Sequence, residues 1–370
     1  MTKVIFYPLG NADSCLVKLT NNLQFVFDYA DMNNPDDPAD KRIPLAKKFK
    51  EDIGWPKRKE IDVLAFTHGD NDHVKGAGDM FWMEHAAIYQ TDEHVKFKEL
   101  WIPAALLVEE GSEDDTRIIR SEARHRFLEM KSGIRVFSRP EHLKDWLEER
   151  GKDLEDYRHL IVDAGRCVPG FTLENQGVEF FVHSPFAKRT DDGEVLDRND
   201  NCLVMQATIR EGSRDTRFLV TADSTWDSWV DIVQATRTHK NDARLAWDLL
   251  KIPHHCSYRS MAEEKGKTKT KPTPEFEWLL EQGTERAVIV SSSWPIPATT
   301  EDQPPHVETY RRYKETADKL DADLVVTMEH PTVKNPDPVV ISIDASGVTM
   351  KREITSGISI VTSTQSPRHG

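Results

Sequence analysis

The sequence predicts a mixed α/β protein in which sheets and helices pack in layers. Short apolar segments typical of strands crowd the first 30 residues, similar segments return after residue 178, and helical patterns separate the later ones. Strands that alternate with helices favour an α/β sandwich over a helical bundle or an all-β barrel. The 370 residues, of which 38% are hydrophobic and 30% charged, suit a globular protein with a buried core.

The first part of the chain predicts three strands, a loop, a helix and a fourth strand. The three short strands are expected at 4–7, 15–19 and 23–27. Asn21-Asn22 before the third is a turn signal, and residues 31–41, rich in Asp, Asn and Pro, predict a loop. A helix is expected to follow up to about Gly54, and the apolar run at 61–66 predicts a buried strand.

Residues 113–165 are highly charged and mostly helical in pattern, which predicts a helical insertion laid over the core. Later strands are expected at 178–182, 202–205, 217–220, 287–290 and 323–326. One helical face is expected from apolar residues three or four apart, namely Val307, Tyr310, Tyr313, Ala317 and Leu320. The Ser- and Thr-rich tail at 356–370 is expected to be disordered, so residues 1–355 are predicted to form one domain.

Composition argues against several functional classes. No apolar run approaches the roughly 20 residues that span a bilayer, and the first residues lack a signal-peptide pattern, so a cytoplasmic protein without a membrane partner is expected. The four cysteines are far apart, with no C-x-x-C pair, and indicate neither a zinc ribbon nor a disulfide framework. The net charge of −14 does not favour non-specific adsorption to nucleic acid, although a local basic groove is compatible with it.

Four potential metal ligands fall within six residues directly after the strand expected at 61–66: His68, Asp70, Asp72 and His73. A strand end holds the first ligand rigidly, and the following loop can bring the others round the same point. Imidazole and carboxylate groups together suit zinc or manganese. The alternative is an ordinary polar loop, but so dense a cluster after a buried strand has few structural uses.

This H-x-D-x-D-H pattern resembles the second motif of the metallo-β-lactamase superfamily. The variant is typical of a branch that includes the phosphorylcholine esterases and the hydrolase domain of ComEC-type DNA-uptake proteins. Five further segments resemble ComEC-like motifs in the same order: 10–14 (G-Q-G-D-S), 27–28 (L-I-D), 199–204 (N-x-N-S-L-V), 219–223 (L-L-T-G-D) and 250–257 (L-K-V-P-H-H-G-S). The resemblance implies a four-layer αββα sandwich with metal ions at one sheet edge.

The resemblance also implies two divalent metal ions, zinc or manganese. It assigns His68 and Asp70 to one ion, Asp72 and His73 to the other, and Asp223 as a bridge between them. Two such ions can clamp a phosphoryl or carbonyl oxygen and activate a hydroxide. The alternative for Asp223 is a helix N-cap.

One member of the pair His254-His255 is expected to complete the second ion's ligands. His254 is the preferred ligand, and His255 would then contact the substrate or donate a proton to the leaving group. The reverse assignment stays open. Asp72, His255 and Asn199 are the predicted catalytic residues.

A third-motif ligand is not evident from the sequence. Asn199 and Asn201 stand where many relatives have a His, but an Asx turn is the alternative. His183 is the other candidate, although a lone His at a strand end is more often structural. Asp28 either orients a ligand His or belongs to a turn.

The predicted function is metal-dependent hydrolysis of a phosphodiester, with nucleic acid as the leading substrate class. The alternatives are a small-ester hydrolase, resembling phosphorylcholine esterases or lactonases, and a scaffold with a silent metal site. Ala222 and Cys256 stand where the branch has Gly, and such departures bear on the substrate rather than on the metal ligands. Alternating lysines follow the His pair and form either a phosphate-contacting rim or a solvated loop: Lys265, Lys267, Lys269 and Lys271.

Overall fold

A computed structural model describes residues 1–111, 114–138, 141–185 and 201–350. Within these residues the first sheet has nine strands in the order β17-β16-β1-β2-β3-β4-β5-β6-β7. In that order the strands are Gly347–Met350, Val339–Asp344, Thr2–Phe6, Cys15–Lys18, Gln24–Phe27, Glu60–Ala65, Lys96–Pro103, Ile134–Phe137 and Ile161–Val162. Strand β16 lies antiparallel to β1, so segments from the two ends of the described chain are neighbours near one edge of this sheet.

The second sheet has six strands in the order β13-β12-β11-β10-β9-β8. In that order they are Asp323–Val326, Gly283–Ser291, Trp247–Lys251, Arg214–Val220, Val204–Glu211 and Val178–Ser184. A separate two-stranded sheet pairs β14 (Pro331–Thr332) with β15 (Asn335–Pro336).

Nine α-helices join these strands in the described part of the chain. They are α1 (Leu45–Ile53), α2 (Asn71–Val74), α3 (Ala77–Met80), α4 (Ala104–Val108), α5 (Asp114–Arg124), α6 (Glu141–Glu148), α7 (Trp226–Thr238), α8 (Pro274–Glu281) and α9 (Val307–Leu320). Shorter helical turns are η1 (Ala87–Tyr89), the π-helical η2 (His125–Met130), η3 (Leu154–Leu160), η5 (Asp242–Leu245), η6 (Pro253–Cys256), η7 (Tyr258–Ser260) and η8 (Thr327–Glu329). None of the described helices is both long and apolar enough to cross a membrane.

Three apolar clusters show that the molecule has four layers. Alternate residues along a strand point to opposite faces of its sheet. On β4, Val63 belongs to the cluster between the two sheets, whereas Leu64 belongs to the cluster beneath the helices of the first half. On β10, Phe218 faces the other sheet and Leu219 faces α7 and α8. The order is therefore helix, sheet, sheet, helix, which confirms the predicted fold class.

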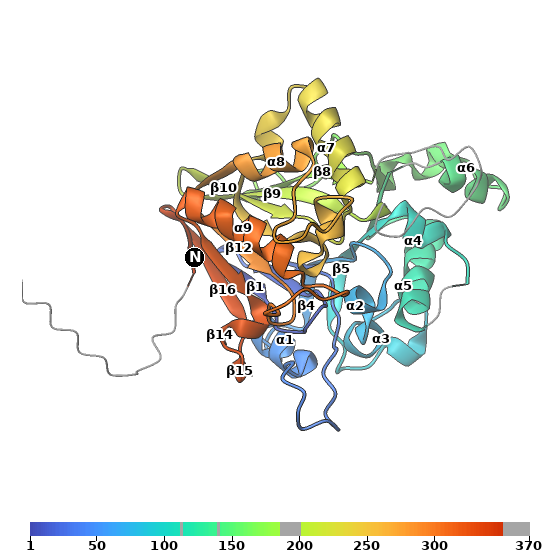
Figure 1. Ribbon diagram of the computed structural model, residues 1–370. Helices are drawn as coiled ribbons and strands as arrows, with labels where there is room; N and C mark the ends of the chain where they lie inside the picture. The colour runs from blue at the N-terminus through green and yellow to red at the C-terminus, as the bar shows by residue number, and fades with distance from the viewer. Residues whose placement is uncertain (112–113, 139–140, 186–200, 351–370) are drawn as a thin grey trace, which may run out of the picture.

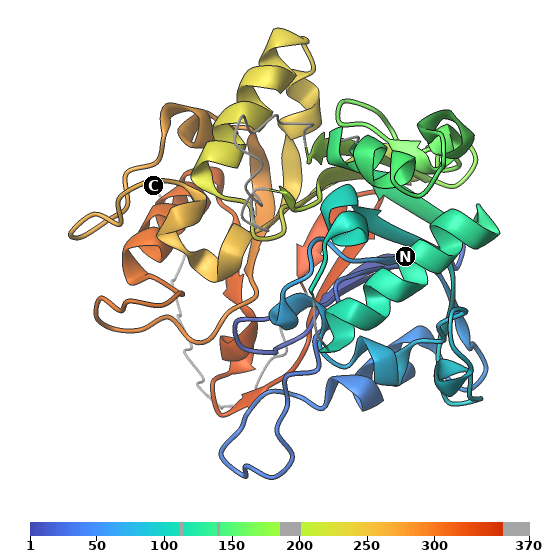
Figure 2. The same ribbon diagram turned by 90° about the vertical axis from the view of Figure 1, so that its right-hand side faces the viewer.

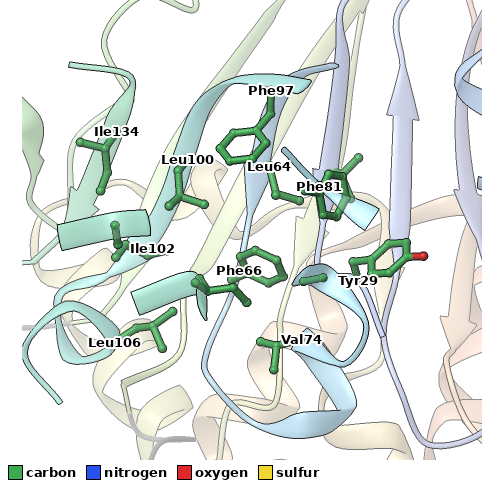
Figure 3. Close-up of a cluster of buried hydrophobic side chains, with 14 of the residues drawn as sticks. Tyr29, Leu64, Phe66, Val74, Phe81, Phe97, Leu100, Ile102, Leu106 and Ile134 are labelled. Atoms are coloured by element: carbon green, nitrogen blue, oxygen red, sulfur yellow. The ribbon is translucent and has the colours of Figure 1, made fainter. Parts of the chain in front are cut away.

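The figures show how the layers divide the chain. In Figures 1 and 2, the blue-to-teal segment with α1 to α5 and the yellow-to-orange segment with α7 to α9 lie on opposite sides of the strands. Figure 3 shows the outer face of the first sheet, where Leu64, Phe66 and Leu100 meet Phe81 and Leu106 from the covering segments. Burial of such side chains is the main stabilising contribution to a fold of this kind.

Parallel strands place several chain crossings at one edge of the sandwich. Strands β3 to β6 are parallel in the first sheet, and β10 to β13 are parallel in the second. Loops that follow the carboxyl ends of parallel strands meet at the same edge, which is where ligand sites form in α/β proteins. The predicted site segments follow β3, β4, β10 and β11 in this way.

The expected strands and the helix at 307–320 are present, while some elements were not anticipated. The segment at 113–165 forms α5 and α6 but also contributes β6 and β7, which extend the first sheet. Strands β5, β16 and β17 also lay outside the expected set. The tail at 356–370 and Asn199 lie outside the described residues.

Candidate metal centre

The loop after β4 brings two buried histidines together. His68 and His73 are 2% and 0% exposed, and their ring centroids are 3.9 Å apart. Gly69 between them packs closely against α4, because a Cβ there would lie 2.8 Å from the Leu106 Cδ1 atom and would force that side chain to shift. The Thr116 hydroxyl on α5 donates to the Gly69 carbonyl at 2.7 Å, which holds this loop against the neighbouring helix.

Asp28, at the end of β3, fixes the orientation of His73. Its Oδ2 atom lies 2.8 Å from His73 Nδ1 and accepts a hydrogen bond from the Thr67 hydroxyl at 2.7 Å. Its Oδ1 atom accepts from the Thr67 backbone N–H at 2.7 Å. Since a carboxylate only accepts, Nδ1 carries the proton, and Nε2 of His73 is left to face the centre.

Asp223 reaches the same point from the second sheet. It follows β10 and is 3% exposed, with its Oδ1 atom 3.4 Å from His73 Nε2 and its Oδ2 atom 3.3 Å from His255 Nε2. Ala222 before it has φ +52°, the left-handed region that favours glycine. The branch that the sequence resembles has Gly at this position, and the left-handed backbone suits that residue.

The His254-His255 pair lies in a tight turn, η6, which follows β11. His254, His255 and Cys256 all have left-handed φ values, of 49°, 52° and 66°. His255 Nδ1 donates to the Ser292 carbonyl at 2.7 Å, which directs Nε2 to within 3.3 Å of Asp72 Oδ2. His254 Nε2 is 3.9 Å from Asp223 Oδ2, and its side chain is 21% exposed.

A fourth carboxylate, missed from the sequence, also borders this cluster. Asp13 lies in the loop between β1 and β2, is 2% exposed, and places Oδ2 at 3.7 Å from His73 Nε2. Lys251, at the end of β11, forms a buried ion pair with it at 2.6 Å. Both residues stand in segments that resemble family motifs, but their contact joins positions far apart in the chain.

The spacing of these groups fits one or more divalent ions. Two sets of side chains each bring their potential ligand atoms within 4.8 Å of one another: Asp13, His73, Asp223 and His255, and His68, Asp72 and His73. In a tetrahedral zinc site with bonds of 2.0–2.1 Å, neighbouring ligand atoms are about 3.3 Å apart. The buried atoms His68 Nε2, His73 Nε2 and Asp223 Oδ1 have no hydrogen-bond partner in the described chain. Buried polar atoms seldom lack partners, so this arrangement suits a cation.

The buried carboxylates favour positive charge on the groups between them. Burial alone would lower the pKa of both His73 and His255. Attraction to Asp28 nevertheless raises the pKa of His73 well above its usual value, and attraction to Asp223 raises the pKa of His255 to about 10. Burial lowers the pKa of His68 to about 4, which keeps that ring neutral. Protons and a divalent ion therefore compete for the same atoms.

The structure brings most of the predicted ligand residues together. The predicted ligands His68, Asp72, His73 and Asp223 belong to the two sets, and Asp70 places its Oδ2 atom 3.6 Å from His68 Nε2. His255, predicted as a catalytic residue, belongs to one set, whereas His254, the ligand preferred from the sequence, belongs to neither. Asn199, a predicted catalytic residue, lies outside the described residues. His183, the alternative third-motif ligand, is outside both sets, and its Nε2 donates to the Arg244 carbonyl at 2.8 Å.

Comparisons with known proteins find similarity at the level of the fold. No family profile matches the chain, and no curated protein sequence matches it. A native metallo-β-lactamase from Legionella gormanii, FEZ-1, is 10% identical over 59% of this chain and 62% of its own, less than two thirds of its length, with a TM-score of 0.26.

Two other solved structures match over more of their length. Unliganded yeast PDE1 is 9% identical over 88% of this chain and 97% of its own, with a TM-score of 0.43. The class B3 di-zinc metallo-β-lactamase LRA-12 from an Alaskan soil metagenome is 12% identical over 86% and 91%, with a TM-score of 0.34. At these identities the likeness concerns the fold alone.

Proposed function

We propose that this protein is a metal-dependent hydrolase that holds two divalent ions, zinc or manganese, and cleaves phosphodiesters. The observation that carries the proposal is that two sets of potential metal ligands share His73. Within these sets the buried atoms His68 Nε2, His73 Nε2 and Asp223 Oδ1 have no hydrogen-bond partner in the described chain. In this proposal Asp72, His73 and His255 surround one ion, and Asp223 bridges to the other. A silent scaffold would have little need to keep so many charged groups buried together.

His68 and Asp70 are proposed to hold the second ion. The Asp70 side chain is 35% exposed, whereas His68 is buried, so this ion would be open to solvent on the side of Asp70. A water ligand and a substrate oxygen need such an open side. Divalent ions in this setting would lower the pKa of a water molecule and stabilise negative charge on a phosphoryl oxygen.

The geometry favours His255 as the ligand and His254 as the residue that faces the substrate, the reverse of the assignment preferred from the sequence. His255 is fixed from behind by the Ser292 carbonyl and is 2% exposed. His254 is more exposed, and burial lowers its pKa. A histidine at the mouth of the site suits proton transfer to the leaving-group oxygen.

A phosphodiester, with nucleic acid as the leading class, is the proposed substrate because the motif order resembles the ComEC-type hydrolase domain. The four lysines at 265–271 differ in their surroundings. Lys265 donates to the Glu301 carbonyl at 2.7 Å, and Lys269 pairs with Glu315 at 2.5 Å, so these two hold the loop to the rest of the protein. Lys267 and Lys271 are exposed and are the better probes.

The function is tested with the full chain stripped of metal and reconstituted with Mn²⁺ or Zn²⁺. We expect up to two ions per chain by elemental analysis and metal-dependent cleavage of an aryl phosphodiester. Asp223→Asn and Asp72→Asn should lose at least one ion and lower turnover by orders of magnitude, while the peripheral His94→Ala should behave like wild type. Full metal content and full activity in Asp223→Asn would show that Asp223 is not a metal ligand.

Substrate class is tested on the same preparations. DNA and RNA oligonucleotides, an aryl phosphodiester, a phosphorylcholine ester and a lactone are compared. If nucleic acid is the substrate, Lys267→Gln/Lys271→Gln should weaken oligonucleotide binding and flatten its salt dependence, with little effect on the aryl phosphodiester. Faster turnover of the lactone or the phosphorylcholine ester than of the DNA and RNA oligonucleotides would favour the small-ester alternative.

A further inference from the structure

Two buried charged groups at the centre have no part in the function proposed above. Asp13 comes from the loop between β1 and β2, and Lys251 comes from the end of β11 in the other sheet. They are 2% and 4% exposed, and the Lys251 Nζ atom lies 2.6 Å from Asp13 Oδ2. The same ammonium lies 3.4 Å from the Ala222 carbonyl, next to Asp223.

Asp13 faces the proposed ions and not solvent. Its Oδ2 atom is 3.7 Å from His73 Nε2, and its ligand atom lies within 4.8 Å of those of His73, Asp223 and His255. Its Oδ1 atom is buried and has no hydrogen-bond partner in the described chain. The position is fixed by the backbone, because the Asp13 N–H donates to the Asp72 carbonyl at 2.9 Å.

The charges around Asp13 explain why a lysine accompanies it. A buried carboxylate in the same cluster as Asp223 is costly unless cations neutralise it. A protonated lysine offers three donors and no lone pair, so it can balance charge but cannot bind a metal ion. One ammonium against these carboxylates still leaves negative charge for a divalent ion to neutralise.

We propose that Asp13 is an additional ligand of the metal centre and that Lys251 is the counter-ion that positions it. The proposal rests on the metal site of the proposed function and adds to it a carboxylate delivered from the β1–β2 loop. The competing account is an ion pair that only joins the two sheets. The two accounts differ in what happens to metal affinity when the pair is replaced by neutral groups of similar shape.

The test compares wild type, Asp13→Asn, Lys251→Met and the double variant by calorimetric titration with Zn²⁺ and by the visible spectrum of the Co²⁺-loaded protein. We expect Asp13→Asn and the double variant to bind at least one ion about tenfold or more weakly, and the Co²⁺ spectrum to change, as loss of a ligand requires. A double variant with wild-type affinity and spectrum would leave Asp13 as a structural partner only and overturn the proposal.

Lys251→Met gives a second readout that does not depend on activity. Without its counter-ion, Asp13 should lower the thermal midpoint of the metal-free protein, and added Zn²⁺ should raise that midpoint by more than it does in wild type. An equal metal-induced rise in the two proteins would contradict the proposal. If wild type itself binds no metal, the proposed function fails; if wild type binds metal and the Asp13 variants bind it equally well, only this inference fails.

Discussion

The imidazole of His183 lies at the end of β8, where Nε2 donates to the Arg244 carbonyl and the ring packs 5.0 Å from that of Phe181. Burial lowers its pKa to about 4, from the 6.5 usual for histidine. The folded state therefore binds a proton less readily than the unfolded chain. Stability that His183 supports above pH 6.5 is lost progressively as the pH falls toward 4.

Replacing His183 by Gln keeps a donor for the Arg244 carbonyl and removes the titration. We expect the variant to lose less unfolding free energy than wild type between pH 7 and pH 4.5, by at most about 3 kcal/mol. Urea unfolding in the presence of chelator measures this while excluding effects of bound metal. An identical pH dependence in the two proteins would show that His183 does not contribute to acid sensitivity.

At this same scale, the sequence predicts residues that lie in one local motif much better than residues that meet across the fold. His68, Asp72 and His73 share one loop, so a single pattern brings them together. Asp13 and Lys251 meet only because β1 and β11 belong to sheets that pack face to face. One signal could have identified them: Asp13 lies in the segment at 10–14 and Lys251 in the segment at 250–257, and both segments resemble motifs of the same family.

The helix α5 holds the loop that carries the proposed ligands, although its charged sequence predicts only an outer cover. Asp115 accepts hydrogen bonds from the backbone N–H groups of Gly76 and Gly78 at 2.9 and 2.7 Å, just after the proposed metal-binding loop. Thr116 donates to the Gly69 carbonyl within that loop. The first turn of α5 therefore braces the segment that carries His68 and His73.

We expect Thr116→Val, which keeps the shape but removes the hydroxyl, to weaken metal binding by about threefold to tenfold. The reason is that a neutral hydrogen bond contributes about 1 kcal/mol and here restrains the ligand loop. Ser121→Ala on the same helix is the matched control, since the Ser121 hydroxyl donates only within α5, to the Arg117 carbonyl. Titration with Zn²⁺ compares the two; equal affinities would show that α5 merely covers the sheet.

Elements were predictable where hydrophobic pattern and length agreed, and less so where tertiary pairing decides the structure. The buried run of β4 and the apolar face of α9 are evident from sequence periodicity. The strands β6 and β7 have only four and two residues within a charged segment. Strand β6 pairs with β5, and β7 pairs in turn with β6. No local pattern distinguishes such strands from loops.

In the molecule as a whole, the proposed ligands come from both sheets. Asp72 and His73 follow β4 of the first sheet, whereas Asp223 and His255 follow β10 and β11 of the second. An ion held by these four residues would bind only when the sheets are packed together, and so would stabilise the native state, by about 2.7 kcal/mol at a free concentration of 100 times Kd.

We therefore expect chelation to lower the thermal midpoint of the metal-loaded protein by several degrees, and re-addition of Zn²⁺ or Mn²⁺ to restore it. In Asp223→Asn the response should be strongly reduced, because the carboxylate between the sheets is lost. Differential scanning fluorimetry with and without EDTA measures both proteins. An undiminished EDTA effect in Asp223→Asn would locate the stabilising ion somewhere else.

The pairing of β1 with β16 has a consequence for folding during synthesis on the ribosome. Thr2 lies opposite Ile343, so β1 waits until the chain as far as β16 has been made before both of its sides are occupied. At roughly 5–20 residues per second, that wait is on the order of tens of seconds. Throughout it, the apolar strand Val4-Ile5-Phe6 has an open flank that could pair with another nascent chain. A chain truncated before Val339 would still contain each of the proposed ligands, yet its β1 strand would keep that flank exposed permanently.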